Sequence, residues 1–365
     1  MILNFDDARK FRGAGFRFDI PVPLPDLGHR WARNLALGNF QALLLVEQES
    51  RKEPIDGVTI EGPGLHDHTH DRFGRYSFSK VELRFAASVH ALLHLGLFEG
   101  KQLFELPDGL VAGMILASPE GRSLCVGVSN DLIDAYSIVH HCYTLPRITD
   151  ADLHLMKLLD WSRPEHPQLV GMVSGIEQGS TRFGRRVDYP GTKIEELDRV
   201  VARKRTPAEA LFLAGLRDLS VERLSSAAAH LCLSVEVFVR SLLAANRDAI
   251  PDKDFEQKTL KPMCERRALL ASLVGSPLSK KSHGMHREHY LRIAALRDRV
   301  LHHGDLRYEI RLGGRVQRVE IEDRAALDEH MQMATSMVAY LNRCCRERGH
   351  REVPFVIAMH EAHSS

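Results

Sequence analysis

The first 145 residues alternate between short hydrophobic segments and turn residues, a pattern that is typical of β-strands. Phe16, Phe18 and Ile20 are separated by charged residues, as expected of a half-buried strand. Similar segments predict strands at residues 40–47, 57–61, 75–85, 109–117 and 122–128. We expect a hairpin turn between the last two, at Ser118-Pro119-Glu120-Gly121. The pattern indicates an antiparallel sheet or sandwich with a few helices.

Three segments before residue 206 have other patterns. Residues 89–98 are apolar enough for a buried strand or a buried helix, and their periodicity does not separate the two. Thr149 and Asp152 have the spacing of a helix N-terminus, and we expect a helix from there to about Trp161. Residues 191–205 are mostly charged, and we interpret them as a linker at the domain boundary.

From residue 206 onwards the hydrophobic positions recur every three or four residues, which predicts amphipathic helices. Thr206 and Glu209 have the spacing of a capping box, with Pro207 at the first helical position. The first long stripe comprises Leu224, Ala228, Leu231, Val235, Phe238 and Leu242. Glu236 lies beside this stripe, and we expect it either at the partly buried edge of the helix or facing Arg297.

Further segments complete the predicted helical part. We expect a helix at residues 259–274, ended by Gly275. Two more stripes comprise Tyr290, Ile293, Leu296 and Val300, and then Leu327, Met331, Ala334, Met337, Leu341 and Cys344. Asp323 is the predicted cap of the closing helix, and residues 308–321 predict a small hairpin before it.

These elements predict an α+β protein with more than one domain. We expect a β-rich N-terminal domain at residues 1–190, with a sensing or substrate-recruiting role and a possible regulatory partner. A linker at 191–205 leads to an all-α helical domain at 206–348, and residues 349–365 form a C-terminal tail. A length of 365 residues fits two domains better than one.

Composition narrows the picture only in part. A net charge of +1 and a pI near 7.8 exclude a global basic field, so any nucleic-acid contact must come from a local patch. We find no apolar stretch of membrane-spanning length and no leader sequence, and we expect a cytoplasmic protein without membrane contact. The six cysteines contain no Cys-x-x-Cys pair, and we interpret them as reduced packing residues.

The candidate chemistry lies at the end of the helix with the Tyr290 stripe. Arg297, Asp298 and His302 fall within one and a half helical turns, and Gly304 is expected to end the helix. Arginine can hold a phosphate with two parallel hydrogen bonds, and histidine exchanges protons near neutral pH. This combination suits chemistry on a phosphodiester. His303 is adjacent, and its side chain diverges by about 100° from that of His302, so we expect only one of them to face a cleft well.

Two other polar stretches carry alternative interpretations. His66, His68 and His70 are metal-ligand types, but they follow a Gly-Pro-Gly turn, so we favour a loop and expect no metal and no cofactor. The stretch from Lys280 to Arg287 is either an exposed loop or a contact to an RNA backbone. The predicted RNA-binding residues are Lys280, Lys281, Arg287, Arg299 and His303.

The order of helices and the sequence Leu-Arg-Asp-x-x-x-His-x-Gly resemble the HEPN superfamily, in particular its Apea-like branch. The resemblance covers about residues 206–346, with Arg297, His302 and Gly304 at the positions of the family motif. Asp298 stands where the family more often has asparagine. The resemblance implies a helical bundle that dimerises through this domain and brings two motifs into one cleft. Active members are metal-independent endoribonucleases, frequently in toxin and antiviral systems, and many relatives are non-catalytic.

If the domain is active, the 2′-hydroxyl of RNA attacks the adjacent phosphate and leaves a 2′,3′-cyclic phosphate and a 5′-hydroxyl. His302 is then the general acid or base, Arg297 stabilises the extra negative charge, and Asp298, four residues before His302 on the same helix face, orients the imidazole or a substrate hydroxyl. The alternative is a non-catalytic dimerisation or binding module for a protein, nucleotide or RNA, in which Arg297 and His302 close a polar network at the dimer seam. A third interpretation is a metal-dependent hydrolase built on His66, His68 and His70.

Overall fold

The computed structural model describes residues 10–20, 22, 24, 31–37, 40–52, 75–93, 106–140, 143, 145, 147–163, 166–173, 197, 200–201, 205–250, 255–256, 263–276, 278, 281–312 and 314–355. The chain divides into two compact units, Met1–Arg203 and Lys204–Ser365. This division falls within the segment 191–205 that we interpreted as a linker. The predicted strand at 57–61 and the histidines at 66, 68 and 70 lie outside the described residues.

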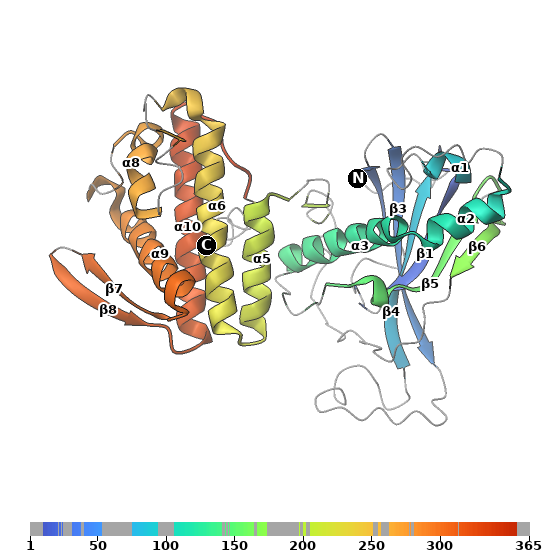
Figure 1. The fold of residues 1–365 in the computed structure, drawn as a ribbon, viewed down its shortest axis with the longest axis horizontal. Helices are drawn as coiled ribbons and strands as arrows, with labels where there is room; N and C mark the ends of the chain where they lie inside the picture. Colours follow the sequence, from blue (N-terminus) through green and yellow to red (C-terminus); the bar gives the residue numbers. More distant parts are fainter. Residues whose placement is uncertain are drawn as a thin grey trace. The chain divides into compact units, whose positions relative to one another are not determined.

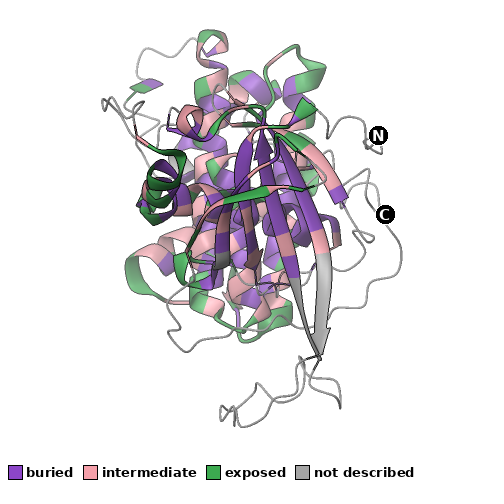
Figure 2. Cartoon of the chain, turned by 90° about the vertical axis from the view of Figure 1, so that its right-hand side faces the viewer, coloured by how far each residue is buried: buried purple, intermediate pink, exposed green. Residues whose placement is uncertain are grey.

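Within the described residues, six strands of the N-terminal unit form one antiparallel sheet in the order β2-β3-β4-β1-β5-β6 (Figure 1). The strands are β1 (Ala14–Ile20), β2 (Trp31–Leu37), β3 (Phe40–Lys52), β4 (Arg75–Phe85), β5 (His154–Asp160) and β6 (Gln168–Val173). The middle strands are buried over most of their described length (Figure 2). The strands predicted at 40–47 and 75–85 are confirmed.

In strand β1 the alternating hydrophobic pattern of the sequence matches the burial of the side chains. Phe16, Phe18 and Ile20 are at most 1% exposed, and they share one face of the strand. Strand β1 lies between β4 and β5, which are far from it in sequence. Gly15 allows the close approach to β4, because a Cβ at this position would lie 2.2 Å from the carbonyl oxygen of Leu83.

The predicted hairpin around residues 118–121 is wrong, because the flanking segments are helices: α2 (Asp108–Ala117) and α3 (Pro119–His140). Ser118 Oγ accepts a hydrogen bond of 2.9 Å from the Gly121 amide, as an N-cap serine does. Pro119 takes the first helical position, where its missing N–H costs nothing. A serine and a proline in this order start a helix as readily as they make a turn. Before them, α1 (Val89–Leu92) is a short helix.

The helix predicted from Thr149 to Trp161 is also wrong beyond its first turn. Thr149 and Asp152 do form the capping box, with the Thr149 amide donating to Asp152 Oδ2 at 2.7 Å. The helix is only the 3₁₀ turn η2 (Asp150–Asp152), and strand β5 follows. Strand β5 pairs with both β1 and β6, so sheet pairing decides the conformation of this segment.

The C-terminal unit is a bundle of helices, and the capping box at Thr206 is confirmed. The helices are α5 (Pro207–Ser220), α6 (Leu224–Ala245), α8 (Met263–Val274), α9 (Gly284–His303) and α10 (Arg324–Glu347), with 3₁₀ turns η3 (Arg247–Ala249) and η4 (Lys281–His283). Helix α6 packs against α5, α8, α9 and α10 (Figure 1). The expected stripes on α9 and α10 are buried, and so is the stripe on α6 from Ala228 onwards, while Leu224 is half-buried.

Helix α6 corrects one expectation from the sequence. Among the described helices it alone reaches the length and apolar composition of a membrane span. In the structure it is the helix around which the bundle packs, and 61% of its most apolar window is buried inside the protein. The described cysteines Cys125, Cys232, Cys344 and Cys345 are free and buried.

Two smaller elements complete this unit. The predicted hairpin is confirmed as β7 (Arg307–Leu312) and β8 (Arg315–Glu320), which pair in antiparallel fashion beside α9 (Figure 1). The start of the predicted tail packs on the bundle, since Asn342 bonds the backbone of Val353 and Phe355 contacts the rings of Phe212 and Phe238. The protein is therefore of mixed α+β architecture, with an antiparallel sheet followed by a helical unit.

Candidate functional site

Helix α9 presents the Arg297–His302 sequence at its C-terminal end. Gly304 ends the helix in the left-handed conformation, with φ of 64°, and its amide bonds the carbonyl of Val300 at 3.0 Å. This conformation strains residues with a Cβ, which explains the glycine at this position. Leu296 and Val300 face the core, so the residues around them are turned towards the helix surface.

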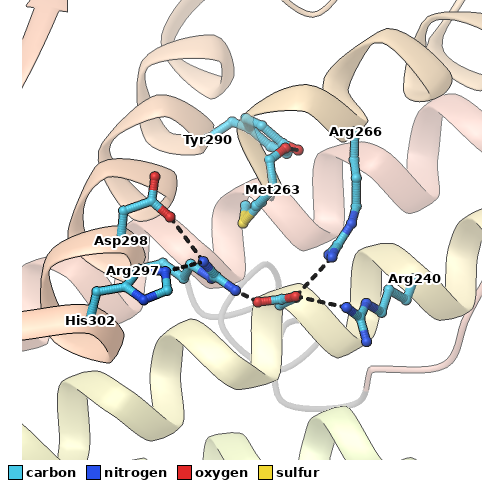
Figure 3. Close-up of polar contacts among 8 residues, drawn as sticks. Arg240, Met263, Arg266, Tyr290, Arg297, Asp298 and His302 are labelled. Carbon is cyan, nitrogen blue, oxygen red and sulfur yellow. Dashed lines mark hydrogen bonds and ion pairs between the residues drawn. The ribbon is translucent and has the colours of Figure 1, made fainter. Parts of the chain in front are cut away.

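Arg297 contacts Asp298 and His302 on its own helix and Glu236 on α6. Its Nε donates to Glu236 Oε2 at 2.9 Å, and its Nη1 donates to Asp298 Oδ1 at 3.0 Å (Figure 3). The same Nη1 lies 3.4 Å from His302 Nε2. Burial by itself would lower the pKa of Arg297, but the bonds to Glu236 and Asp298 raise it above its ordinary value. The guanidinium is therefore charged and fixed in direction.

Glu236 is the carboxylate beneath this group, and its side chain is only 7% exposed. Arg266 Nη2 donates to it at 2.9 Å, and Arg240 Nη2 lies 3.2 Å from it (Figure 3). Burial alone would raise the pKa of Glu236, but the hydrogen bonds and charges of Arg266 and Arg297 lower it. One carboxylate thus faces three guanidinium groups, which leaves an excess of positive charge beneath the end of α9.

His302 is exposed and contacts this positive cluster from outside. A guanidinium has no acceptor, so Arg297 Nη1 donates and His302 Nε2 accepts in this contact. Asp298 and His302 are four residues apart on one helix face, a spacing that would let Asp298 orient the imidazole. In the structure Arg297 lies between them and contacts both. The three residues are brought together as predicted, but the arginine is the centre.

An open hollow of about 440 Å³ adjoins His302. It lies between the end of α9 and strand β7, and its lining residues are Ala295, Asp298, Arg299, His302, His303, Tyr308 and Glu309. Both His302 and His303 line the hollow, although we expect only one of them to face a cleft well. The hollow is wide and open enough to receive side chains that point about 100° apart around the helix.

The structure brings only part of the predicted RNA-binding set to this hollow. Arg299 and His303 line it, whereas Lys281 and Arg287 lie near the other end of α9. At about 1.5 Å per residue, Arg287 precedes His302 by about 22 Å along the helix. Lys280 lies outside the described residues.

The loop interpretation of residues 281–287 is wrong, because they form η4 and the first turn of α9. His283 is buried there and faces Ser276 Oγ at 2.8 Å and the Tyr340 hydroxyl at 2.8 Å. These contacts fix the turn to the bundle, so part of this basic stretch is a packing element.

Sequence reasoning missed Arg240, Arg266 and the wall formed by Tyr308 and Glu309. Arg240 follows Glu236 by four residues, a helical spacing that could have identified it. Arg266 gave no such signal, because its contact with Glu236 joins two helices 30 residues apart and the side chain is fully buried.

Among the described residues, no group of three or more histidine, cysteine, aspartate or glutamate side chains is placed to hold a metal ion. The metal-type histidines at 66, 68 and 70 are not among these residues.

Comparisons of the chain with protein-family models, with curated proteins and with solved structures found no match. The class of the protein is therefore defined by its own fold and site. It is an α+β protein whose helical unit carries an arginine–histidine pair beside an open hollow.

Proposed function

We propose that the C-terminal unit is a metal-independent endoribonuclease of the HEPN type. The observation that supports this most is the 3.4 Å contact between Arg297 Nη1 and His302 Nε2 beside an open hollow. A charged phosphate ligand and a proton acceptor are then adjacent, which phosphodiester cleavage requires. A role in toxin or antiviral systems belongs to this proposal as well.

In the proposed reaction the ribose 2′-oxygen forms a bond to phosphorus and the bond to the 5′-oxygen breaks. His302 Nε2 accepts the proton of the 2′-hydroxyl, and a second acidic group returns a proton to the leaving oxygen. A homodimer through the helical unit would supply that group from the second motif. Arg297, held by Glu236, would bind the phosphate oxygens as negative charge increases.

Asp298 has a different role from the one that its spacing indicated. Its carboxylate bonds Arg297 Nη1, and at 46% exposure it lies on the solvent side of the arginine. An anion at this position repels phosphate but also orients the guanidinium. We propose that Asp298 positions Arg297 and does not contact the reacting atoms.

The second candidate function is a non-catalytic binding or dimerisation module. It is favoured by the bond between Arg297 and Glu236, which gives the arginine a structural partner, and by the 14% exposure of the Arg297 side chain. In this alternative the polar network of Arg297, Asp298 and His302 closes a contact surface and no bond is broken.

An RNA cleavage assay on the full chain, with and without a chelator, tests the two candidates. We expect cleavage to persist in the chelator, to fail on DNA and to leave 2′,3′-cyclic phosphate and 5′-hydroxyl ends. His302→Ala should lower the rate by about 10²- to 10⁴-fold, the usual contribution of a general acid or base. His303→Ala is the matched control, and we expect it to lower the rate less. Ends with a 5′-phosphate, or full activity of the His302→Ala protein, would remove the nuclease proposal.

A further inference from the structure

The β7–β8 hairpin carries an unusual amount of charge next to the candidate site. Its ionisable residues are four arginines and two glutamates: Arg307, Glu309, Arg311, Arg315, Arg318 and Glu320. The protein as a whole is nearly neutral, with a net charge of +1. The hairpin is thus a local basic feature, the kind of patch that a nearly neutral protein needs to contact a polyanion.

The hairpin is fixed to the bundle on one side and open on the other. Tyr308 and Ile310 are buried, and the Tyr308 hydroxyl bonds His330 Nε2 on α10 at 2.7 Å. No residue of β8 is buried. A rigid attachment with an exposed outer strand presents its side chains in a defined arrangement.

The ion pairs of the hairpin leave two arginines uncompensated. Glu309 pairs with Arg318 at 2.7 Å, and Arg307 pairs with Asp305 at 3.1 Å and lies 4.0 Å from Glu320. Among the residues that the structure describes, Arg311 and Arg315 have no carboxylate partner. In the strand register Arg311 is opposite Val316, and Arg315 is opposite Leu312 beside the tip.

Arg311 continues the hollow described above, whereas Arg315, as the register partner of Leu312, lies on the other face of the hairpin beside its tip. Glu309 lines the hollow, and Arg311 lies on the same face of β7, two residues or about 6.6 Å further along the strand. A chain that enters the hollow can therefore pass over Arg311 and meet Arg315 where it rounds the tip of the hairpin. The charged side chains of β8 also disfavour an extended peptide at its free edge, which argues against a protein strand as the occupant.

We propose that the β7–β8 hairpin binds the backbone of a single-stranded nucleic acid, with Arg311 contacting a phosphate next to the nucleotide in the hollow and Arg315 contacting a phosphate further along, at the tip of the hairpin. The choice of RNA as the natural strand rests on the proposed nuclease function. The contact to the phosphates does not depend on cleavage.

The test is the binding of a fluorescent 12-mer of 2′-O-methyl uridine to the full chain, followed by anisotropy over a range of salt concentrations. This probe carries no free 2′-hydroxyl. Arg311→Ala/Arg315→Ala is compared with Arg223→Ala/Arg267→Ala, which removes the same charge from two exposed residues, one at the N-cap of α6 and 3.9 Å from Asp218, the other on α8. We expect the hairpin variant to bind about 10-fold more weakly near 0.1 M salt, with a salt slope shallower by about 1.4. The control variant should bind like the wild type.

Equal binding by the two variants, or no binding by the wild type, would overturn the proposal. Stronger binding of an acidic peptide than of the oligonucleotide would overturn it too and indicate a protein partner. A parallel assay with an all-ribose 12-mer separates the two proposals. Hairpin-dependent binding without any cleavage leaves this inference intact and removes the nuclease, whereas cleavage with unchanged binding does the opposite.

Discussion

Glu236 connects the stability of the bundle to the geometry of the candidate site. Its carboxylate accepts hydrogen bonds from Arg266 on α8 and Arg297 on α9, and its own helix is α6. The same residue therefore holds three helices together and aims the guanidinium at His302. A change at Glu236 should affect both properties, and the two can be measured separately.

Glu236→Gln keeps the shape of the side chain and removes its charge. Arg266, which is fully buried, then lacks its counter-charge, and we expect the free energy of unfolding to fall by about 3 to 5 kcal/mol. Urea unfolding followed by circular dichroism measures this change. Glu309→Gln is the control, because its pair with Arg318 is exposed and should contribute about 1 kcal/mol or less. Equal losses in the two variants would contradict the structural role of Glu236.

The lowered pKa of His330 gives a prediction of how the free energy of unfolding changes with pH. Burial lowers its pKa below the ordinary value of 6.5, and its Nδ1 faces the Ala326 carbonyl at 2.7 Å. The unfolded chain therefore takes up the proton at a higher pH than the folded chain does. The contribution of His330 is present above pH 6.5 and is lost as the pH falls from there towards the lower, folded-state pKa. His286 and His289, whose pKa values burial also lowers, act in the same direction.

We expect the free energy of unfolding to decrease between pH 7 and pH 5, and urea titrations at several pH values measure it. One such histidine contributes at most about 1.4 kcal/mol per pH unit. His330→Gln should flatten the dependence, because it removes one titrating group. A stability that rises on acidification over this range would contradict the prediction.

At the scale of elements, the sequence predicts some helix ends correctly and others wrongly. Thr206, Asp323 and Gly304 act as predicted, since each signal acts through the backbone of its own neighbours. Ser118 and Pro119 were misread as a turn, because the same two residue types serve both structures. At residues 109–128 the apolar positions permitted either a strand or a helix.

Gly304 gives a prediction for the end of α9. Gly304→Ala should destabilise the protein by about 1 to 2 kcal/mol, because φ at this position is 64° and a Cβ is strained there. Gly304→Asn should cost less, since asparagine tolerates the left-handed conformation better. Thermal unfolding of both variants measures the difference. If alanine and asparagine had the same effect, backbone strain would not explain the glycine.

At the scale of the whole molecule, the proposed chemistry requires a second copy. One arginine and one histidine offer few groups for both proton transfers, and a two-fold axis would double them in one cleft. The helical unit is compact by itself, and its α9 end is exposed at His302 and His303. We therefore expect a homodimer through this unit.

Light scattering of the full chain at micromolar concentration should give twice the mass of one chain, which is 41.1 kDa. The His302→Ala protein should remain a dimer, because the exposed His302 side chain contacts Arg297 at 3.4 Å and Glu236 still holds that arginine in place. A monomer that still cleaves RNA would contradict the two-motif cleft. A dimer without cleavage would favour the binding-module alternative.

The sequence by itself determined the helical stripes of the C-terminal unit, the caps at Thr206, Gly304 and Asp323, and the hairpin at 307–320, but not the start of α9. Their signals are local, since stripes at helical spacing and capping residues act within a few positions of one another. The Arg297–His302 spacing was likewise readable, because both residues share one helix. Strands β1 and β4 were found through their alternating pattern, and β3 through its apolar run at residues 42–46.

Only the tertiary structure decided which carboxylate faces Arg297, where the hollow lies and how the six strands are ordered. Glu236 and Arg297 are 61 residues apart, and nothing within either helix selects the other. Strand β5 takes its conformation from pairing with β1 and β6, and that pairing overrides the helix signal at Thr149. Contacts between distant segments depend on the packing of whole elements, which local sequence patterns do not encode.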